Sequence, residues 1–166
     1  MYTIISGTNR EDSFTQKVAS VYKEILESKG VSPNMLTLMN INVLSRNEEF
    51  LKMERELLIP TKKFIFIIPE YNGSYPGILK TMIDTSDIKE SWWWKKALLT
   101  GVSAGRAGNL RGMDHLNGTL QYLKMFVHPN KLPISTVDTL FDASGAISHT
   151  PTNLSISSQL DEFIDF

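Results

Sequence analysis

An apolar run in the middle of the chain constrains the fold more than any other feature of the sequence. The run is Phe64-Ile65-Phe66-Ile67-Ile68, preceded by Lys62-Lys63 and ended by Pro69. Side chains alternate between the two faces of a strand, so a strand made only of apolar residues needs cover on both faces. Central strands of parallel sheets have this composition, because helices pack on both of their faces. The run therefore predicts a parallel sheet inside an α/β domain.

The segments on either side of this run alternate between strand and helix patterns. Further strands are expected at residues 2–6, 35–39, 97–103 and 132–137. Helices are expected at residues 14–26, about 47–58, 77–85, about 113–126 and 155–166. Ser13 and Ser45 each open the S-x-x-[EQ] pattern of a capping box, and Gly30 is a stop for the first helix. Alternating strands and helices predict a single domain over residues 1–166, with a five-stranded parallel sheet between two helical layers.

Composition excludes several classes of protein. With 17 basic and 18 acidic side chains in 166 residues, no excess of positive charge exists for a nucleic acid partner. Cysteine is absent, which excludes disulfides, thiolate metal sites and cysteine nucleophiles. No apolar run approaches the roughly 20 residues of a membrane span. The first residues lack the charged and apolar regions of a signal peptide, so we expect a cytoplasmic protein with no membrane partner.

A parallel sheet of this kind binds ligands beyond the carboxyl ends of its strands, where the strand order reverses. The loop after the first strand, residues 7–15, is rich in hydroxyls, carries Arg10 and leads into a helix N-terminus. Such a terminus offers unpaired N–H groups and a positive dipole end, and phosphate is its usual anion. The loop matches neither the Walker pattern nor the Rossmann glycine pattern. The alternative is an ordinary loop in which Ser13 serves only as the N-cap.

Two more loops follow the third and fourth strands. Residues 69–77 contain two prolines, two glycines and Asn72, which predicts a rigid, sharply turned segment where a flat ligand could lie. Residues 101–112 contain four glycines, which let the backbone approach another group closely. The alternatives are a structural turn whose tyrosines pack on the core, and a flexible surface loop.

At these loops the sequence resembles the NADPH-dependent FMN reductases, a family of flavodoxin-like flavoproteins. The family's second loop reads P-E-Y-N-x-S-x-P-x-x-L-K-x-x-I-D, and residues 69–84 fill every named position. Its first loop reads approximately G-S-x-R-x-x-S-x-[NT]; residues 7–15 follow it, with Thr8 in place of the serine. The glycine-rich third loop fits loosely, and no family pattern is visible after about residue 135.

The resemblance implies a three-layer flavodoxin-like fold, FMN as cofactor, and NADPH or NADH as co-substrate. It implies that Thr8, Arg10, Ser13 and Thr15 hold the FMN phosphate, beside Phe14. It implies that Pro69, Glu70, Tyr71, Asn72 and Gly73 border the flavin ring and ribityl chain, with Ser103, Gly105 and Arg106 on the far side. Hydride would pass from the nicotinamide to FMN and then to a small-molecule acceptor in the same pocket. No catalytic acid or base and no metal is expected, and the family implies a homodimer or a homotetramer.

Other functions fit parts of the sequence. A flavodoxin-like module could bind FMN for electron transfer alone, and a related fold could have lost the flavin. A serine hydrolase could use Ser103 in Gly101-Val102-Ser103-Ala104-Gly105, which matches G-x-S-x-G, with Asp138 or Asp142 and His149. The glycines after Ser103 and the lack of an HGGG-type segment argue against it. Finally, Trp92-Trp93-Trp94 cannot all face one core, so at least one of these rings is expected outside it.

Overall fold

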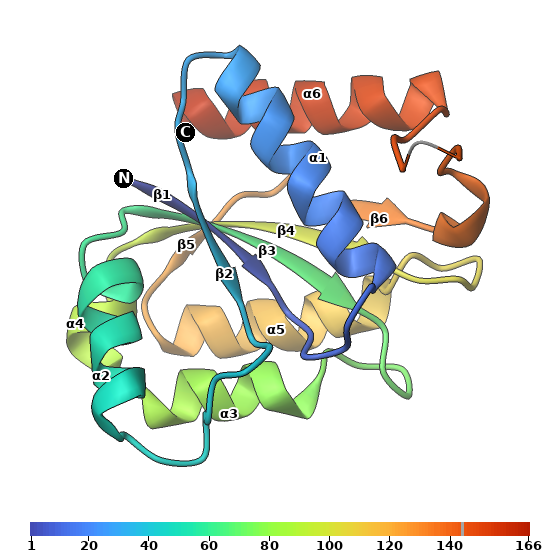
Figure 1. Cartoon of the computed structure of the whole chain (residues 1–166). Coiled ribbons are helices and arrows are strands. Elements are labelled where there is room, and N and C mark those ends of the chain that lie inside the picture. The colour runs from blue at the N-terminus through green and yellow to red at the C-terminus, as the bar shows by residue number, and fades with distance from the viewer. Residues whose placement is uncertain (144) are drawn as a thin grey trace.

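The computed structural model describes residues 1–143 and 145–166 and has one parallel sheet between two layers of helices (Figure 1). The strands are β1 (Tyr2–Ser6), β2 (Asn34–Thr37), β3 (Lys63–Pro69), β4 (Lys96–Val102), β5 (Phe126–Val127) and β6 (Leu132–Ile134). Their order is β2-β1-β3-β4-β5, and β6 pairs with β4 farther along the same strand. This is the flavodoxin-like order, whose switch point lies between β1 and β3. The predicted fold class is confirmed.

Helices cover both faces of this sheet. The helices are α1 (Phe14–Ser28), α2 (Glu48–Met53), α3 (Gly77–Thr85), α4 (Ile88–Trp92), α5 (Leu110–Tyr122) and α6 (Thr150–Asp165), with a π-helical turn at Glu54–Leu58 and a 3-10 turn at Val137–Thr139. Figure 1 shows α1 and α6 on one face, and α2, α3, α4 and α5 on the other. None of the described helices is both long and apolar enough to span a membrane.

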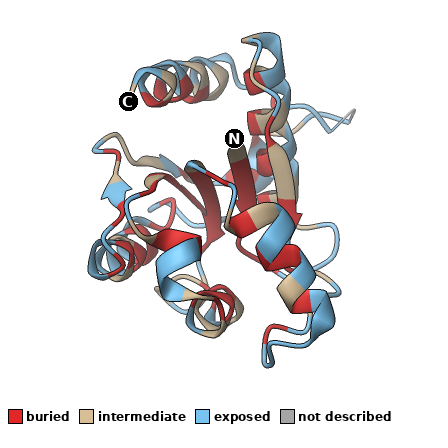
Figure 2. Ribbon diagram, turned by 90° about the vertical axis from the view of Figure 1, so that its left-hand side faces the viewer, coloured by how far each residue is buried: buried red, intermediate tan, exposed pale blue. Residues whose placement is uncertain are grey.

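Strand β3 has the double-sided burial that its composition predicts. Phe64, Phe66 and Ile68 belong to the core under α3 and α5, whereas Ile65 and Ile67 belong to the core under α1 and α6. All five side chains are fully buried, and the buried strands lie between the helical layers in Figure 2. Because β1, β3 and β4 run parallel, the loops that follow them all leave from the carboxyl ends of the strands, on the same side of the sheet.

Several predicted boundaries are wrong, and each error has a local cause. Helix α2 begins after Asn47, whose side chain accepts from the Phe50 amide, so Ser45 is not its cap. The first capping box is half right: Ser13 caps α1, but the Gln16 side chain reaches Thr37 instead of returning to Ser13. Helix α4 was not predicted. Its last residue, Trp92, is fully buried, while Trp94 is 64% exposed, as the run of three tryptophans required.

The fifth strand position also differs from the prediction. The helix expected to reach Phe126 ends at Tyr122, because Lys124 has a left-handed φ of 57° and Phe126 then pairs with β4 as the start of β5. The strand expected at 132–137 ends at Ile134. Between β5 and β6 the edge of β4 has no strand beside it, and the side chain of Gln159 on α6 fills this gap. Its Nε2 donates to the Leu99 carbonyl at 3.2 Å and to the Asn130 carbonyl at 2.9 Å.

Candidate functional site

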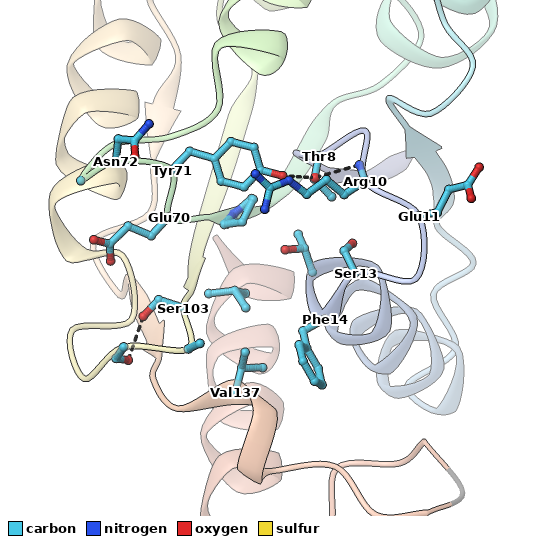
Figure 3. A pocket seen from close by; sticks show the side chains of 16 residues that line it. Thr8, Arg10, Glu11, Ser13, Phe14, Glu70, Tyr71, Asn72, Ser103 and Val137 are labelled. Atoms are coloured by element: carbon cyan, nitrogen blue, oxygen red, sulfur yellow. Dashed lines mark hydrogen bonds between the residues drawn. The ribbon is translucent and has the colours of Figure 1, made fainter.

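The three loops enclose a pocket of about 520 Å³ at the carboxyl edge of the sheet (Figure 3). This volume lies within the range of small-molecule and cofactor sites, roughly 300–1,000 Å³. Its 16 lining residues are Thr8, Arg10, Glu11, Ser13, Phe14, Thr15, Pro69, Glu70, Tyr71, Asn72, Gly73, Val102, Ser103, Ala104, Gly105 and Val137. The pocket thus forms at the place where doubly wound sheets bind ligands.

The N-terminus of α1 makes one wall of the pocket. Ser13 has extended backbone, and its Oγ accepts from the Gln16 amide at 3.2 Å, which satisfies one of the free N–H groups of the helix. In the described part of the chain, the amides of Phe14 and Thr15 have no acceptor. These donors and the positive dipole end make this wall suitable for an anion. The role of Ser13 as N-cap leaves its hydroxyl proton free to donate, so capping and anion binding are compatible.

The second loop turns sharply because of Asn72 and Gly73. Both have left-handed backbone, with φ of 52° and 76°. Tyr71 and Ser74 on either side exchange two N–H···O bonds, of 2.9 and 3.1 Å. Asn-Gly is the preferred pair for such a two-residue turn, since both central positions need positive φ. The sharp turn predicted from the sequence is therefore present, and Asn72 and Gly73 line the pocket.

Tyr71 links the second loop to the first. Its hydroxyl lies 2.7 Å from Oγ1 of Thr8, which is fully buried and also accepts from the Arg10 amide. The Arg10 guanidinium lies 4.3 Å from the centre of the Tyr71 ring (Figure 3). Because a guanidinium stacked on an aromatic face keeps its in-plane N–H donors, Arg10 can still bind an oxyanion from this position. The first and second loops therefore form one connected wall of the pocket.

The third loop is held by the chain that follows β6. The Ser103 hydroxyl donates to the Gly105 carbonyl at 2.9 Å. The amides of Val137 and Thr136 donate to the carbonyls of Ser103 and Gly105, each at 3.1 Å. These bonds carry Val137 into the pocket, opposite the Tyr71 wall (Figure 3).

The glycines of the third loop serve close packing within the chain more than ligand approach. A Cβ on Gly101 would lie 2.1 Å from the Gly108 carbonyl oxygen, and a Cβ on Gly112 would lie 2.1 Å from Oδ1 of Asn109. A Cβ on Gly105 would meet only Ser103 Oγ, at 3.9 Å. Of these glycines, Gly105 lines the pocket. The loop is therefore packed against the ends of β3 and β4, in contrast to the flexible-surface alternative.

The structure brings together all the sequence-predicted site residues except Arg106, which lies in the third loop outside the pocket lining. Sequence reasoning missed Glu11, Val102, Ala104 and Val137. The first three are sequence neighbours of predicted residues, so counting every residue at these positions of the loops as a candidate would have included them. Val137 had no such signal, because its place depends on the hydrogen bonds between the third loop and the chain after β6.

The serine hydrolase alternative is not supported. The Ser103 hydroxyl is bonded to its own loop, and α5 begins only at Leu110, whereas a nucleophile elbow turns directly into a helix. His149 Nδ1 lies 2.8 Å from the Thr152 hydroxyl. The histidine lines a separate pocket beside α6. No His149–Ser103 pair exists to activate the hydroxyl as a nucleophile.

Comparison with known proteins identifies the family of this chain. Residues 2–139 match the family model for NADPH-dependent FMN reductases. An NAD(P)H-dependent FMN reductase of Pseudomonas aeruginosa is 36% identical over 64% of this chain and 59% of its own length. A 2-hydroxy-1,4-benzoquinone reductase of a Burkholderia species is 24% identical over 96% of this chain and 92% of its own.

A solved structure shows the same fold. It is FerB, a flavoenzyme NAD(P)H:(acceptor) oxidoreductase from Paracoccus denitrificans, with a TM-score of 0.83 at 22% identity, over 99% of this chain and 94% of its own. The family match extends from β1 through the first turn after β6, and so includes all three loops of the pocket. The chain therefore belongs to the NADPH-dependent FMN reductase family of flavodoxin-like oxidoreductases.

Proposed function

We propose that this protein is an NAD(P)H-dependent oxidoreductase that holds FMN in the three-loop pocket and reduces a small-molecule acceptor there. The observation that carries the proposal is the convergence of the α1 N-terminus, the Asn72-Gly73 turn and the Ser103 loop on a single pocket. The family match and the names of the relatives, FMN reductase and quinone reductase, support the same reaction class. FMN held in this pocket would supply the hydride-transfer chemistry between NAD(P)H and the acceptor.

The residues present fit FMN. The free amides of Phe14 and Thr15, with the Ser13 hydroxyl and Arg10, offer charge-assisted bonds to the phosphate. The pocket also has an apolar part suited to a flat ring, made of the side chains of Phe14, Val102, Ala104 and Val137. Thr8 would act on the phosphate indirectly, through Arg10 and Tyr71, since its Oγ1 already bonds both residues. Arg106 lies outside the lining, and we propose that it contacts the nicotinamide co-substrate.

The contribution of the protein to the chemistry is binding and orientation. Four residues of the second loop would hold the flavin ring and leave one of its faces open, first for the nicotinamide and then for the acceptor. These residues are Glu70, Tyr71, Asn72 and Gly73. Backbone N–H groups of the loops would stabilise negative charge that develops on the ring, as preorganised donors do. Hydride transfer needs no side-chain acid or base. Ser103 and His149, the residues of the hydrolase alternative, each form a hydrogen bond within their own segment.

An absorption spectrum of the purified protein, with FMN titrated in, tests the proposal. We expect saturable binding of FMN and bleaching of its visible bands by NADPH or NADH under anaerobic conditions, followed by turnover with a quinone. Binding of FMN with no turnover would indicate an electron-transfer module instead. Failure to bind FMN would refute the proposal.

We further propose a homodimer or homotetramer in the cytoplasm. The exposed rings of Trp94 and Phe126, 6.3 Å apart and 64% and 49% exposed, support association of copies. Sedimentation at micromolar concentration should show a species larger than the 18.8 kDa monomer, and a monomer alone would contradict this proposal. Cell fractionation tests the location.

A further inference from the structure

Asn109, just before α5, makes an unusual set of contacts at the end of β3. The residue is 1% exposed and has left-handed backbone, with φ of 60° and ψ of 35°. Its Nδ2 donates to the carbonyls of Ile68 at 3.1 Å and Pro69 at 2.9 Å. Its Oδ1 accepts from the Gly112 amide at 3.2 Å. One side chain thus joins the start of α5 to the strand end from which the second loop leaves.

Few residues can meet these three demands together. The left-handed backbone favours Gly, Asn and Asp. Capping α5 needs a short side chain with an acceptor, which Asn and Asp supply and Gly does not. Donating to two carbonyls needs an NH₂ group, which only Asn of these three carries. The sequence around Asn109 is adapted to it, because any Cβ at Gly112 would collide with its Oδ1.

The two carbonyls lie where the pocket begins. Gly7 donates to the Ile67 carbonyl, after which β1 leaves the sheet and enters the first loop. The next two carbonyls of β3, those of Ile68 and Pro69, receive the Asn109 amide, and the Glu70 amide donates to the Val102 carbonyl. The backbone is thus held at Ile68 and at Pro69, which is the first residue of the second loop that lines the pocket.

We propose that Asn109 is a positioning residue for cofactor binding. Through the carbonyls of Ile68 and Pro69, it holds residues 70–73 of the second loop in the arrangement that binds the cofactor. This inference rests on the proposed function. It assigns to Asn109 a role beyond capping α5, although its side chain does not line the pocket.

The isosteric variant Asn109→Asp separates the two roles. It keeps the left-handed preference and the acceptor for the Gly112 amide, but places a carboxylate oxygen against the two carbonyls. We expect the dissociation constant for FMN to rise by about tenfold or more, as two hydrogen bonds are lost. Asn40→Asp is the matched control, since Asn40 also has a φ of 60° but is exposed and lies outside the pocket lining. It should leave FMN affinity within about twofold.

Two further readouts distinguish positioning from a merely structural role. At saturating FMN, kcat of Asn109→Asp should return to within about twofold of the wild type, while the half-saturating FMN concentration stays raised. In FMN-free protein, hydrogen exchange should accelerate in residues 70–74 in Asn109→Asp and not in Asn40→Asp. Wild-type FMN affinity and exchange in folded Asn109→Asp would overturn the inference, and so would uniform acceleration across the sheet with unchanged affinity.

If Asn109→Asp does not fold, Asn109→Gly decides, because it keeps the backbone conformation and removes the side-chain amide without adding charge. It also removes the acceptor for the Gly112 amide, so the faster exchange must appear at residues 70–74 and not only in the first turn of α5. Weaker FMN binding together with faster hydrogen exchange at residues 70–74 supports the inference. Wild-type FMN affinity and wild-type exchange rates refute it. The proposed function fails separately: wild-type protein that binds no FMN refutes that function, and the exchange data on FMN-free protein still judge the link between Asn109 and the second loop.

Discussion

Ser13→Asp separates two roles that the structure gives to one side chain. Aspartate is as good an N-cap as serine, so the bond to the Gln16 amide can be kept. A negative charge in the first turn is also favourable to a helix. The free energy of unfolding should therefore change by less than about 0.5 kcal/mol. The proposed phosphate, by contrast, would face a carboxylate instead of a hydroxyl.

The expected loss of affinity follows from Coulomb's law. Two unit charges about 5 Å apart in an effective dielectric of about 20 repel by about 3 kcal/mol. The partial exposure of Ser13 screens this repulsion, and the double charge of the phosphate increases it. We expect FMN binding to weaken by about 2–3 kcal/mol, or roughly 30- to 150-fold.

Fluorescence titration with FMN and with riboflavin measures this effect. Riboflavin has the same ring and ribityl chain without the phosphate, so its affinity should change by less than about threefold in Ser13→Asp. Asn47→Asp is the matched control, because Asn47 caps α2, outside the pocket lining, through the Phe50 amide. It should alter neither affinity. FMN affinity that is unchanged in folded Ser13→Asp, or equal losses for FMN and riboflavin, would refute the placement of the phosphate at the α1 N-terminus.

Three further predictions concern stability, each measured by urea unfolding. Gly101→Ala should destabilise the protein by about 1–3 kcal/mol, since its Cβ would lie 2.1 Å from a backbone oxygen. Gly118→Ala, at an open position on α5, should instead stabilise it by about 0.5–1 kcal/mol. Equal changes in the free energy of unfolding for the two variants would contradict this contrast. Gln159→Leu should cost about 3 kcal/mol, because the carbonyls of Leu99 and Asn130 lose a donor, and the hydroxyls of Tyr22 and Thr100, which still bond each other, lose an acceptor. A loss below about 1 kcal/mol would show that the gap beside β4 closes without Gln159. Burial lowers the pKa of Lys95 from 10.5 to about 8, so the unfolded chain binds more protons than the folded chain between pH 8 and pH 10.5. The wild type should therefore gain stability relative to Lys95→Met as the pH rises from 8 to 10.5. A stability difference that stays constant over this range would contradict the lowered pKa.

Much of the fold could be read from local patterns. The apolar run of β3 required cover on both faces, and the alternation of strands and helices required parallel pairing. The turn at Asn72-Gly73 and the cap at Ser13 follow from backbone preferences that act over about four residues. These features depend on near neighbours in the chain, so the sequence alone could predict them, and the pocket loops with them.

Contacts between distant segments decided the rest. The break in the fifth strand could not be predicted, because the Gln159 side chain that fills it comes from a helix at the end of the chain. Val137 enters the pocket, and Asn109 reaches β3, only because of hydrogen bonds between segments that no local pattern relates. The sequence by itself determined the order of the elements and the chemistry of the three loops. Only the tertiary structure decided which side chains join those loops into one pocket, since that depends on how packed helices bring remote residues within hydrogen-bond distance.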